Sequence, residues 1–250
     1  RLESQEFLDG VKTKYIMSKI LLSNGCSWVN GAGLKDRNNE RWSHHLSKKM
    51  DMKDINISSE GASNDTITRT TIEWFTKNQV DFKDVFVVIG WTQFTRAEFF
   101  NDVTQEYENQ NFVSFGDSKT DKTTEDFFEK QSKMMLRPSD LTPTHTWWRV
   151  YLKYYFNFEK KLTDYVNNVL FLQSFFKSNN INFLQYQSFG EGHKDVISNK
   201  LIDNNLFISE MMDDSILDQS DDSGHPGLKS HQQWSNKLYD NIKGLKYEKE

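Results

Sequence analysis

The stretch ILLSNGCSWVNG, residues 20–31, decides how the rest of the chain is interpreted. The apolar run at 19–23 ends at Asn24-Gly25, which is typical of a buried parallel strand that closes in a tight turn. Ser27 comes directly after this turn. It is therefore either a nucleophile held at the end of a strand or an ordinary polar residue of a turn, and the remaining sequence has to decide between the two.

The composition excludes several classes of protein. A chain of 250 residues suits one large α/β domain, and a net charge of −5 without a basic stripe argues against nucleic-acid binding. No apolar run reaches the ~18 residues that span a bilayer. The charged N-terminus does not resemble a signal peptide, so we expect a cytoplasmic protein of the producing or host cell, with virion association as an alternative. Its one cysteine excludes an internal disulfide.

Apolar patterning predicts alternating strands and helices. Further strands are expected at 54–58, 84–89 and 181–186, and helices at 41–50, 66–77, 147–177 and 227–245. This alternation predicts a three-layer α/β/α fold with a doubly wound, mostly parallel sheet.

The domain organisation follows from the same pattern. Residues 17–250 are expected to form a single domain, with a polar insertion or lid at about 101–144 that contains one helix near 124–135. Residues 1–16 are interpreted as an N-terminal extension or the remnant of an added sequence. In doubly wound sheets the site lies beyond the carboxyl ends of the strands, so the chemistry is expected in the loops there.

Ser27 needs a base, and His225 is the histidine whose surroundings suit that role. A serine hydroxyl becomes nucleophilic when a base removes its proton. In the stretch DDSGHPG, residues 221–227, Asp222 lies three residues before His225 and can fold back onto ring atom Nδ1, which leaves Nε2 free. Asp221 is the alternative partner. The competing interpretation is a polar turn that precedes the last helix.

An acyl-transfer site also needs donors for an oxyanion, which are often backbone N–H groups in turns. Gly61, after the second predicted strand, could offer such a group, and Asn64 is a nearby amide. The third predicted strand is followed by Thr92 and Gln93 at the same edge of the sheet. An ordinary turn remains the alternative interpretation of Gly61.

Four blocks of the sequence, in order, resemble the SGNH (GDSL-type) hydrolase superfamily. NGCSWVNG resembles the first block with Ser27 as nucleophile, and SSEGASND resembles the second with Gly61 at its glycine. VVIGWTQ stands where the third block belongs, and DSGHPG matches the last, with Asp222 and His225. The resemblance implies a flavodoxin-like SGNH hydrolase fold and a Ser-His-Asp triad. The sequence patterns GWT…R…E and DSGHPG…H…W are also similar to those of family members that bacteriophages encode.

The chain departs from the family pattern in the third block. The family has an oxyanion-donating asparagine where this chain has Thr92. Losing one such donor typically costs ~100–1000-fold in rate, unless Thr92, Gln93 or Asn64 substitutes. Cys26 stands where an aspartate is common, and packing beneath the turn is its expected role.

The other candidate groups favour structural roles. A metal site at His225 and His231 lacks further ligands, so no metal or cofactor is expected. The pair His44-His45 and the aromatic series at 147–158 are interpreted as packing, although the aromatic series could also bind a carbohydrate or acyl group. Arg96 and Glu98 either bind substrate or pair with each other.

These expectations combine into one function. We expect a serine esterase that hydrolyses a carboxylic ester, with O-acetyl groups on a carbohydrate as the favoured substrate by analogy. An acyltransferase on the same triad is one alternative. A non-catalytic module that binds a glycan or a protein partner on an SGNH scaffold is the other.

Overall fold

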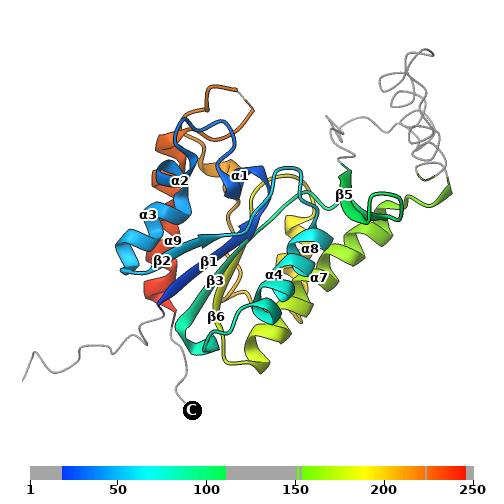
Figure 1. Ribbon diagram of the computed structural model, residues 1–250, viewed down its shortest axis with the longest axis horizontal. Coiled ribbons are helices and arrows are strands. Elements are labelled where there is room, and N and C mark those ends of the chain that lie inside the picture. The colour runs from blue at the N-terminus through cyan, green and yellow to red at the C-terminus, as the bar shows by residue number, and fades with distance from the viewer. Residues whose placement is uncertain (1–18, 111–150, 152–153, 223, 246–250) are drawn as a thin grey trace, which may run out of the picture.

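The computed structural model describes residues 19–110, 151, 154–222 and 224–245. Its central sheet has the order β2-β1-β3-β6, and all three neighbouring pairs are parallel. The four strands are β1 (Ile20–Gly25), β2 (Lys53–Asn56), β3 (Val85–Trp91) and β6 (Asn182–Gln187). The predicted doubly wound parallel sheet is therefore confirmed (Figure 1).

Helices cover both faces of the sheet, as Figure 1 shows. On one face lie α3 (Trp42–Met50) and α9 (Leu228–Gly244), which contact each other. On the other face lie α4 (Asn64–Lys77) and α7 (Phe158–Ser178). Apolar side chains at helical spacing explain this arrangement, since Trp234, Leu238 and Ile242 of α9 are all buried.

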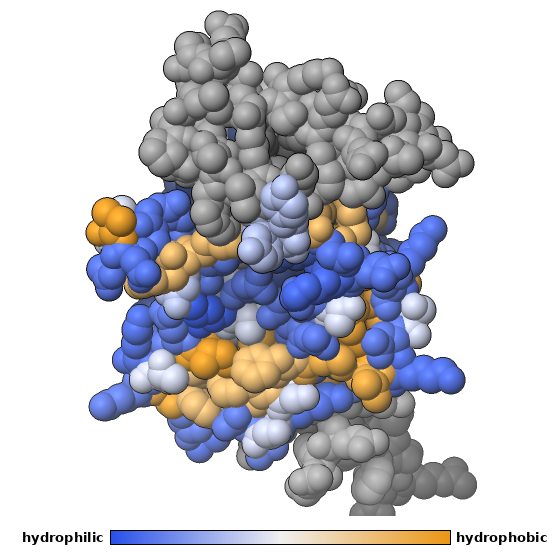
Figure 2. Space-filling model, turned by 90° about the vertical axis from the view of Figure 1, so that its right-hand side faces the viewer, coloured by the Kyte–Doolittle hydropathy of each residue, from blue (hydrophilic) through white to orange (hydrophobic). Residues whose placement is uncertain are grey.

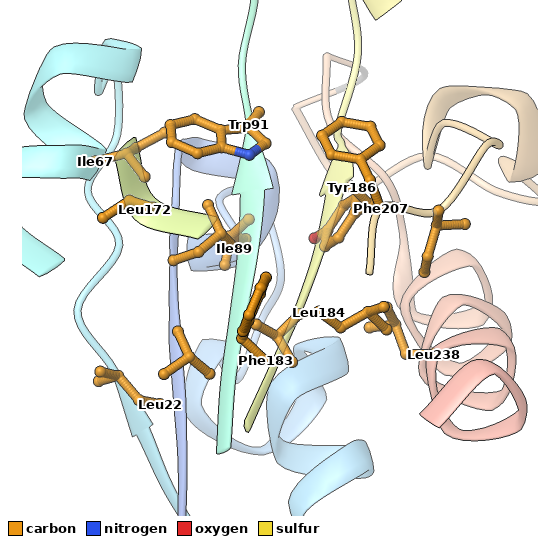
Figure 3. Packing of buried hydrophobic residues seen from close by; sticks show 14 of the residues in the cluster. Leu22, Ile67, Ile89, Trp91, Leu172, Phe183, Leu184, Tyr186, Phe207 and Leu238 are labelled. Carbon is orange, nitrogen blue, oxygen red and sulfur yellow. The ribbon is translucent and has the colours of Figure 1, made fainter. Parts of the chain in front are cut away.

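The core lies between the sheet and these two helical layers. All seven residues of β3 are buried, which fits a central strand covered on both faces. Leu172 of α7 and Leu238 of α9 approach the strands from opposite sides (Figure 3). On the face formed by α4 and α7, apolar side chains also form a band between polar ones (Figure 2), and Phe171 of α7 is about half exposed.

Gly25 and Gly90 are neighbours in the sheet, and close packing requires both. A Cβ atom on Gly25 would lie 2.3 Å from Val29 Cγ2, and one on Gly90 would lie 2.5 Å from the same atom and 2.7 Å from Tyr186 Oη. The two glycines thus let the segment after β1 pack directly onto the ends of the strands.

The middle of the chain differs from expectation in one element. The start of the predicted insertion at 101–144 forms part of an antiparallel hairpin, β4 (Ala97–Asn101) and β5 (Glu106–Gln110). The insertion itself stays a prediction, and its expected helix lies outside the described residues. The predicted helix at 147–177 is wrong as a continuous element, because the chain leaves helical structure at 155–157. The helix α7 begins afresh at Phe158, where the Asn157 side chain caps it by accepting from Lys160 N.

Several short elements complete the described chain. They are the helices α1 (Ser27–Asn30), α2 (Arg37–Glu40) and α8 (His193–Ser198) and the 3₁₀ turns Phe82–Asp84 and Asp213–Ser215. A parallel bridge from Gln185 to Phe207 extends the edge of β6. In the part of the chain that the structure describes, no helix is both long and apolar enough to cross a membrane.

Candidate active site

The candidate site lies at the carboxyl ends of β1 and β3. The chain runs from β1 to β2 on one side of β1, and then returns to β3 on the other side, so the order of the strands reverses here. Ligands of doubly wound sheets bind at this kind of reversal. Ser27 is placed at this point because α1 begins directly after β1 (Figure 1).

Ser27 is the first residue of α1 and is only 6% exposed. Its carbonyl accepts hydrogen bonds from Gly31 N and Ala32 N, which close the short helix behind it. Its own N–H belongs to the first turn of the helix, where backbone donors have no helical acceptor. This N–H is therefore oriented away from the helix and available to an external oxygen.

Asparagine side chains attach α1 to the end of β2. Asn56 Nδ2 donates to Val29 O at 3.0 Å, and Asn30 Nδ2 donates to Ser58 O at 2.9 Å. Asn24, at the end of β1, is buried and donates to Thr70 Oγ1, Thr71 Oγ1 and Ile67 O of α4. These hydrogen bonds of buried and partly buried side chains hold the Ser27 turn in one position.

Asp222 and His225 meet through their side chains, as the sequence spacing predicts. His225 Nδ1 lies 2.6 Å from Asp222 Oδ2. Asp222 Oδ1 also accepts from Ser220 Oγ at 2.7 Å, from Gly224 N at 2.9 Å and from His225 N at 3.1 Å. With Nδ1–H directed at the carboxylate, the imidazole is held in the tautomer whose Nε2 can accept a proton.

Hydrogen bonds also keep the carboxylate of Asp222 ionised. The Ser220 hydroxyl, the Gly224 N–H and the His225 ring lower the pKa of Asp222 to about 2, with the hydroxyl as the largest cause. The side chain of Asp222 is nevertheless 41% exposed, and that of His225 is 26% exposed. The Asp-His pair therefore sits at the surface of the molecule, on a loop of its own.

Gly33 connects this loop to the Ser27 side of the site. A Cβ atom on Gly33 would lie 2.3 Å from Ser220 Oγ and 2.7 Å from Asp222 Oδ2, and its φ of +79° belongs to the left-handed region. The base loop thus packs onto a glycine six residues after Ser27. Among the described residues, no hydrogen bond joins Ser27 Oγ to the His225 ring, and such catalytic contacts often tighten only when substrate binds.

Gly61 lies in a turn next to the end of β1. Ser59 N donates to Gly25 O at 3.2 Å, and Ala62 N donates to Ser59 O at 3.3 Å. Gly61 has a φ of +74°, and open space surrounds the position of a Cβ atom there. Within the described chain, its N–H has no acceptor, so it remains available to a ligand oxygen.

The three predicted side-chain donors have different surroundings. The amide of Asn64 links α4 to β3, because Nδ2 donates to Thr92 O at 3.1 Å and Oδ1 accepts from Thr92 N at 3.0 Å. Thr92 is fully buried, and its hydroxyl has no partner among the described residues. Gln93 is 9% exposed, and its amide forms no hydrogen bond with the described residues.

Of the two alternatives for Arg96 and Glu98, mutual pairing is not found within the described chain, and substrate binding remains a prediction. Glu98 instead binds Arg69 of α4, at 2.6 Å and 2.9 Å, because the helix brings that guanidinium over β4. Arg96 Nη1 donates to Ala62 O at 3.2 Å. The two charged residues therefore belong to different parts of the structure.

His231 and Cys26 have structural surroundings. His231 is fully buried and accepts from Trp42 N at 3.2 Å, and burial, with a smaller contribution from His45, lowers its pKa to about 3. Cys26 is also fully buried. In the described ranges no three His, Cys, Asp or Glu side chains are grouped in a way that could hold a metal ion.

Comparisons with known proteins agree with this fold. Residues 29–240 match the Family of unknown function (DUF6071). The chain belongs to this family. No curated protein sequence matches it.

Solved structures similar to this DUF6071 chain include TesA, at 11% identity and a TM-score of 0.50, over 91% of this chain and 99% of that one. Esterase EstA from Pseudoalteromonas sp., inhibited by monoethylphosphonate, has 13% identity and a TM-score of 0.46, covering 90% and 97%. An acetyl xylan esterase from Butyrivibrio proteoclasticus has 11% identity and a TM-score of 0.46, covering 91% and 64%. The similarity to TesA agrees with the expected α/β fold with a mostly parallel sheet.

Some residues that position the site in this DUF6071 chain were not predicted from the sequence. Ser220 and Gly33 hold the Asp222 carboxylate, and Asn56 and Asn30 hold the helix that starts at Ser27. The pair of glycines in NGAG, residues 30–33, was an available signal for a close approach. No local signal identifies Ser220, because its contact with Gly33 joins segments far apart in the chain.

Proposed function

We propose that this chain is a serine esterase of the SGNH type, with Ser27, His225 and Asp222 as its triad. The observation that carries the proposal is the 2.6 Å contact between His225 Nδ1 and Asp222 Oδ2. It occurs in a loop that packs onto Gly33, just after Ser27 in the chain. A serine after the first strand, an oriented imidazole and an ionised carboxylate are the groups that acyl transfer requires.

In the proposed reaction, Ser27 Oγ attacks the carbonyl carbon of an ester while His225 Nε2 takes the hydroxyl proton. The carbonyl oxygen becomes an oxyanion in the tetrahedral intermediate. This intermediate collapses, the C–O bond to the alcohol breaks, and His225 returns the proton to the leaving oxygen. Water, activated by the same imidazole, then hydrolyses the acyl-serine.

The oxyanion is proposed to accept hydrogen bonds from the backbone N–H groups of Ser27 and Gly61. Gln93 is the best candidate for the third donor. The amide of Asn64 already binds the backbone of Thr92, and the hydroxyl of Thr92 is buried. Gln93, at the next position of the chain, is buried and its amide has no partner among the described residues, so it can replace the asparagine of the third family block.

The proposed substrate is a carboxylic ester, with O-acetyl groups on a carbohydrate as the favoured class. The reaction needs no cofactor, since the base, the orienting carboxylate and the donors come from the chain. The buried hydroxyl of Thr92 favours one competing function, a non-catalytic binding module, because the family donor is absent from its usual position. An acyltransferase would use the same residues with an acceptor other than water.

The proposal is tested by hydrolysis of p-nitrophenyl acetate by the wild type, Ser27→Ala and Ser198→Ala. Ser198 is an exposed serine at the end of α8, so its variant controls for loss of a hydroxyl away from the site. We expect Ser27→Ala to lower kcat/KM by about 1000-fold or more, and the control to keep the wild-type rate. Equal rates for the wild type and Ser27→Ala would contradict an esterase and favour the binding module.

A further inference from the structure

Arg96 occupies a central position among the loops of the candidate site. It follows β3 and is only 6% exposed. Its Nη1 donates to Ala62 O, next to Gly61, and its guanidinium interacts with the side chain of Cys26, next to Ser27. Its terminal carbon also lies 5.1 Å from the ring centre of Phe189, in the loop after β6. One side chain thus contacts the loops that follow β1, β2 and β6.

The charge of Arg96 has no carboxylate partner within the described part of the chain. Glu98, the nearest acid in sequence, is bound by Arg69 instead. Arg96 Nε is buried and makes no hydrogen bond. Burial lowers the pKa of the guanidinium, but an arginine side chain remains protonated in proteins. Among the described residues the guanidinium of Arg96 therefore forms no ion pair, although Asp65 and Asp164 line the same small pocket.

A purely structural role explains this arrangement poorly. Burying an unpaired charge is unfavourable, and a neutral side chain could fill the same space. A fixed positive charge becomes favourable at the moment when negative charge develops on a bound substrate in a site that excludes water. In the proposed reaction that moment is the formation of the oxyanion beside Ser27 and Gly61.

We propose that Arg96 is a positioning residue for the oxyanion-binding turn, and that its charge favours the anionic tetrahedral intermediate. Through Ala62 O it holds the Gly61 turn against the Ser27 turn, and its charge offsets part of the loss of the family asparagine at Thr92. The inference rests on the proposed esterase function. Because the ester substrate is neutral and only the intermediate is anionic, Arg96 acts on kcat more than on KM.

The test compares Arg96→Met, Arg96→Lys and Arg69→Met with the wild type, using p-nitrophenyl acetate. Methionine removes the charge, whereas lysine keeps it without the planar fork. Arg69→Met is the matched control, because it removes a guanidinium from the ion pair with Glu98 on α4 and β4, outside the crevice. Thermal unfolding of each variant separates loss of folding from loss of rate.

We expect Arg96→Met to lower kcat by about 10- to 100-fold with KM within about threefold of the wild type. Arg96→Lys should recover most of that loss, and Arg69→Met should keep its kcat even where its unfolding temperature falls. A folded Arg96→Met with kcat within about twofold of the wild type, or no recovery of kcat with lysine, would overturn the inference about Arg96. Either result would leave the proposed esterase function standing. If the wild type has no Ser27-dependent hydrolysis, the proposed function fails first, and the role of Arg96 with it.

Discussion

Ser27 and His225 belong to two parts of the molecule that are held in different ways. The turn at Ser27 is buried, follows the central strand β1 and is attached to β2 by Asn56 and Asn30. The loop at His225 is partly exposed, and within the described chain the hydrogen bonds to the Asp222 carboxylate come from Ser220, Gly224 and His225. The nucleophile is thus positioned by the sheet, and the base by its own loop.

This difference separates stability from activity. Substitutions that disturb the Ser27 turn act on buried hydrogen bonds and on packing, so they affect folding as well as rate. Substitutions on the exposed base loop leave the core intact and affect chiefly the rate. A set of variants from the two regions tests whether this division holds, in order of decreasing expected effect.

The largest effect is expected at the base. Replacement of His225 by Gln should lower kcat/KM by about 1000-fold or more, because no other group can take the Ser27 proton. The unfolding temperature should stay within about 2 °C of the wild type, since the ring is partly exposed. Steady-state kinetics and thermal unfolding measure the two quantities. A large fall in unfolding temperature would show that the base loop supports the core.

The next largest effect on the rate is expected at the proposed third oxyanion donor, which follows β3. Gln93→Leu should lower kcat by about 100-fold, as loss of one such donor typically does, while Thr92→Val should stay within a few-fold. Leucine keeps the Cβ and Cγ atoms that lie close to Gly190. Kinetics with p-nitrophenyl acetate decide the assignment, and the opposite ranking would transfer the donor role to the Thr92 hydroxyl.

Where the two regions meet, Gly33 and Gly61 offer a matched pair. Gly33 has a φ of +79° and Gly61 a φ of +74°. Only a Cβ atom on Gly33 would overlap Ser220 and Asp222. Gly33→Ala should therefore lower kcat/KM by about tenfold or more, because it displaces the Asp222 carboxylate. Both variants should lose about 1 kcal/mol of stability from backbone strain. A Gly33→Ala variant with the kcat/KM of the wild type would mean that the contact at Gly33 does not position the base.

At neutral pH the smallest effect on stability is expected from His231, because its contribution changes only when the pH falls. His231 has a folded-state pKa of about 3, below its usual 6.5, because it is buried. Above pH 6.5 both states are neutral there, whereas below 6.5 the unfolded chain binds a proton that the folded chain does not. Stability should fall by up to about 4 kcal/mol from this residue as pH drops from 6.5 toward 3.

The variant His231→Asn isolates this contribution, since asparagine can still accept from Trp42 N. Urea unfolding between pH 7 and pH 4 should show a weaker pH dependence for the variant than for the wild type. The same slope for both proteins would mean that His231 is protonated in the folded state or exposed.

The sequence predicted the features of the fold that depend on local pattern. The apolar runs of β1 and β3 end at glycines, and α9 shows Trp234, Leu238 and Ile242 at helical spacing, so these elements were expected close to their observed bounds. The hairpin of β4 and β5 was missed because β5 is mostly polar and the two strands pair with each other outside the central sheet. A period of two is hard to recognise in such strands.

In the candidate site too, contacts between residues close in sequence were predicted and contacts between distant residues were not. The contact between Asp222 and His225 follows from a spacing of three residues, so local reasoning sufficed. Arg96 was one possible partner of Glu98 because it is close in sequence, whereas the observed partner, Arg69, reaches Glu98 from α4 through the fold. Gly33 and Ser220 meet across almost the whole chain, and a single sequence does not show such contacts.

The most direct test of the account is covalent labelling of Ser27 by a fluorophosphonate probe, followed by peptide mass spectrometry. The probe forms a stable phosphonyl-serine only where a base activates the hydroxyl and the oxyanion is stabilised. We predict one label on Ser27 in the wild type, no label in Ser27→Ala and at least about 100-fold slower labelling in His225→Gln. An unlabelled Ser27 in the folded wild-type protein, or labelling that does not depend on His225, would contradict the proposed triad.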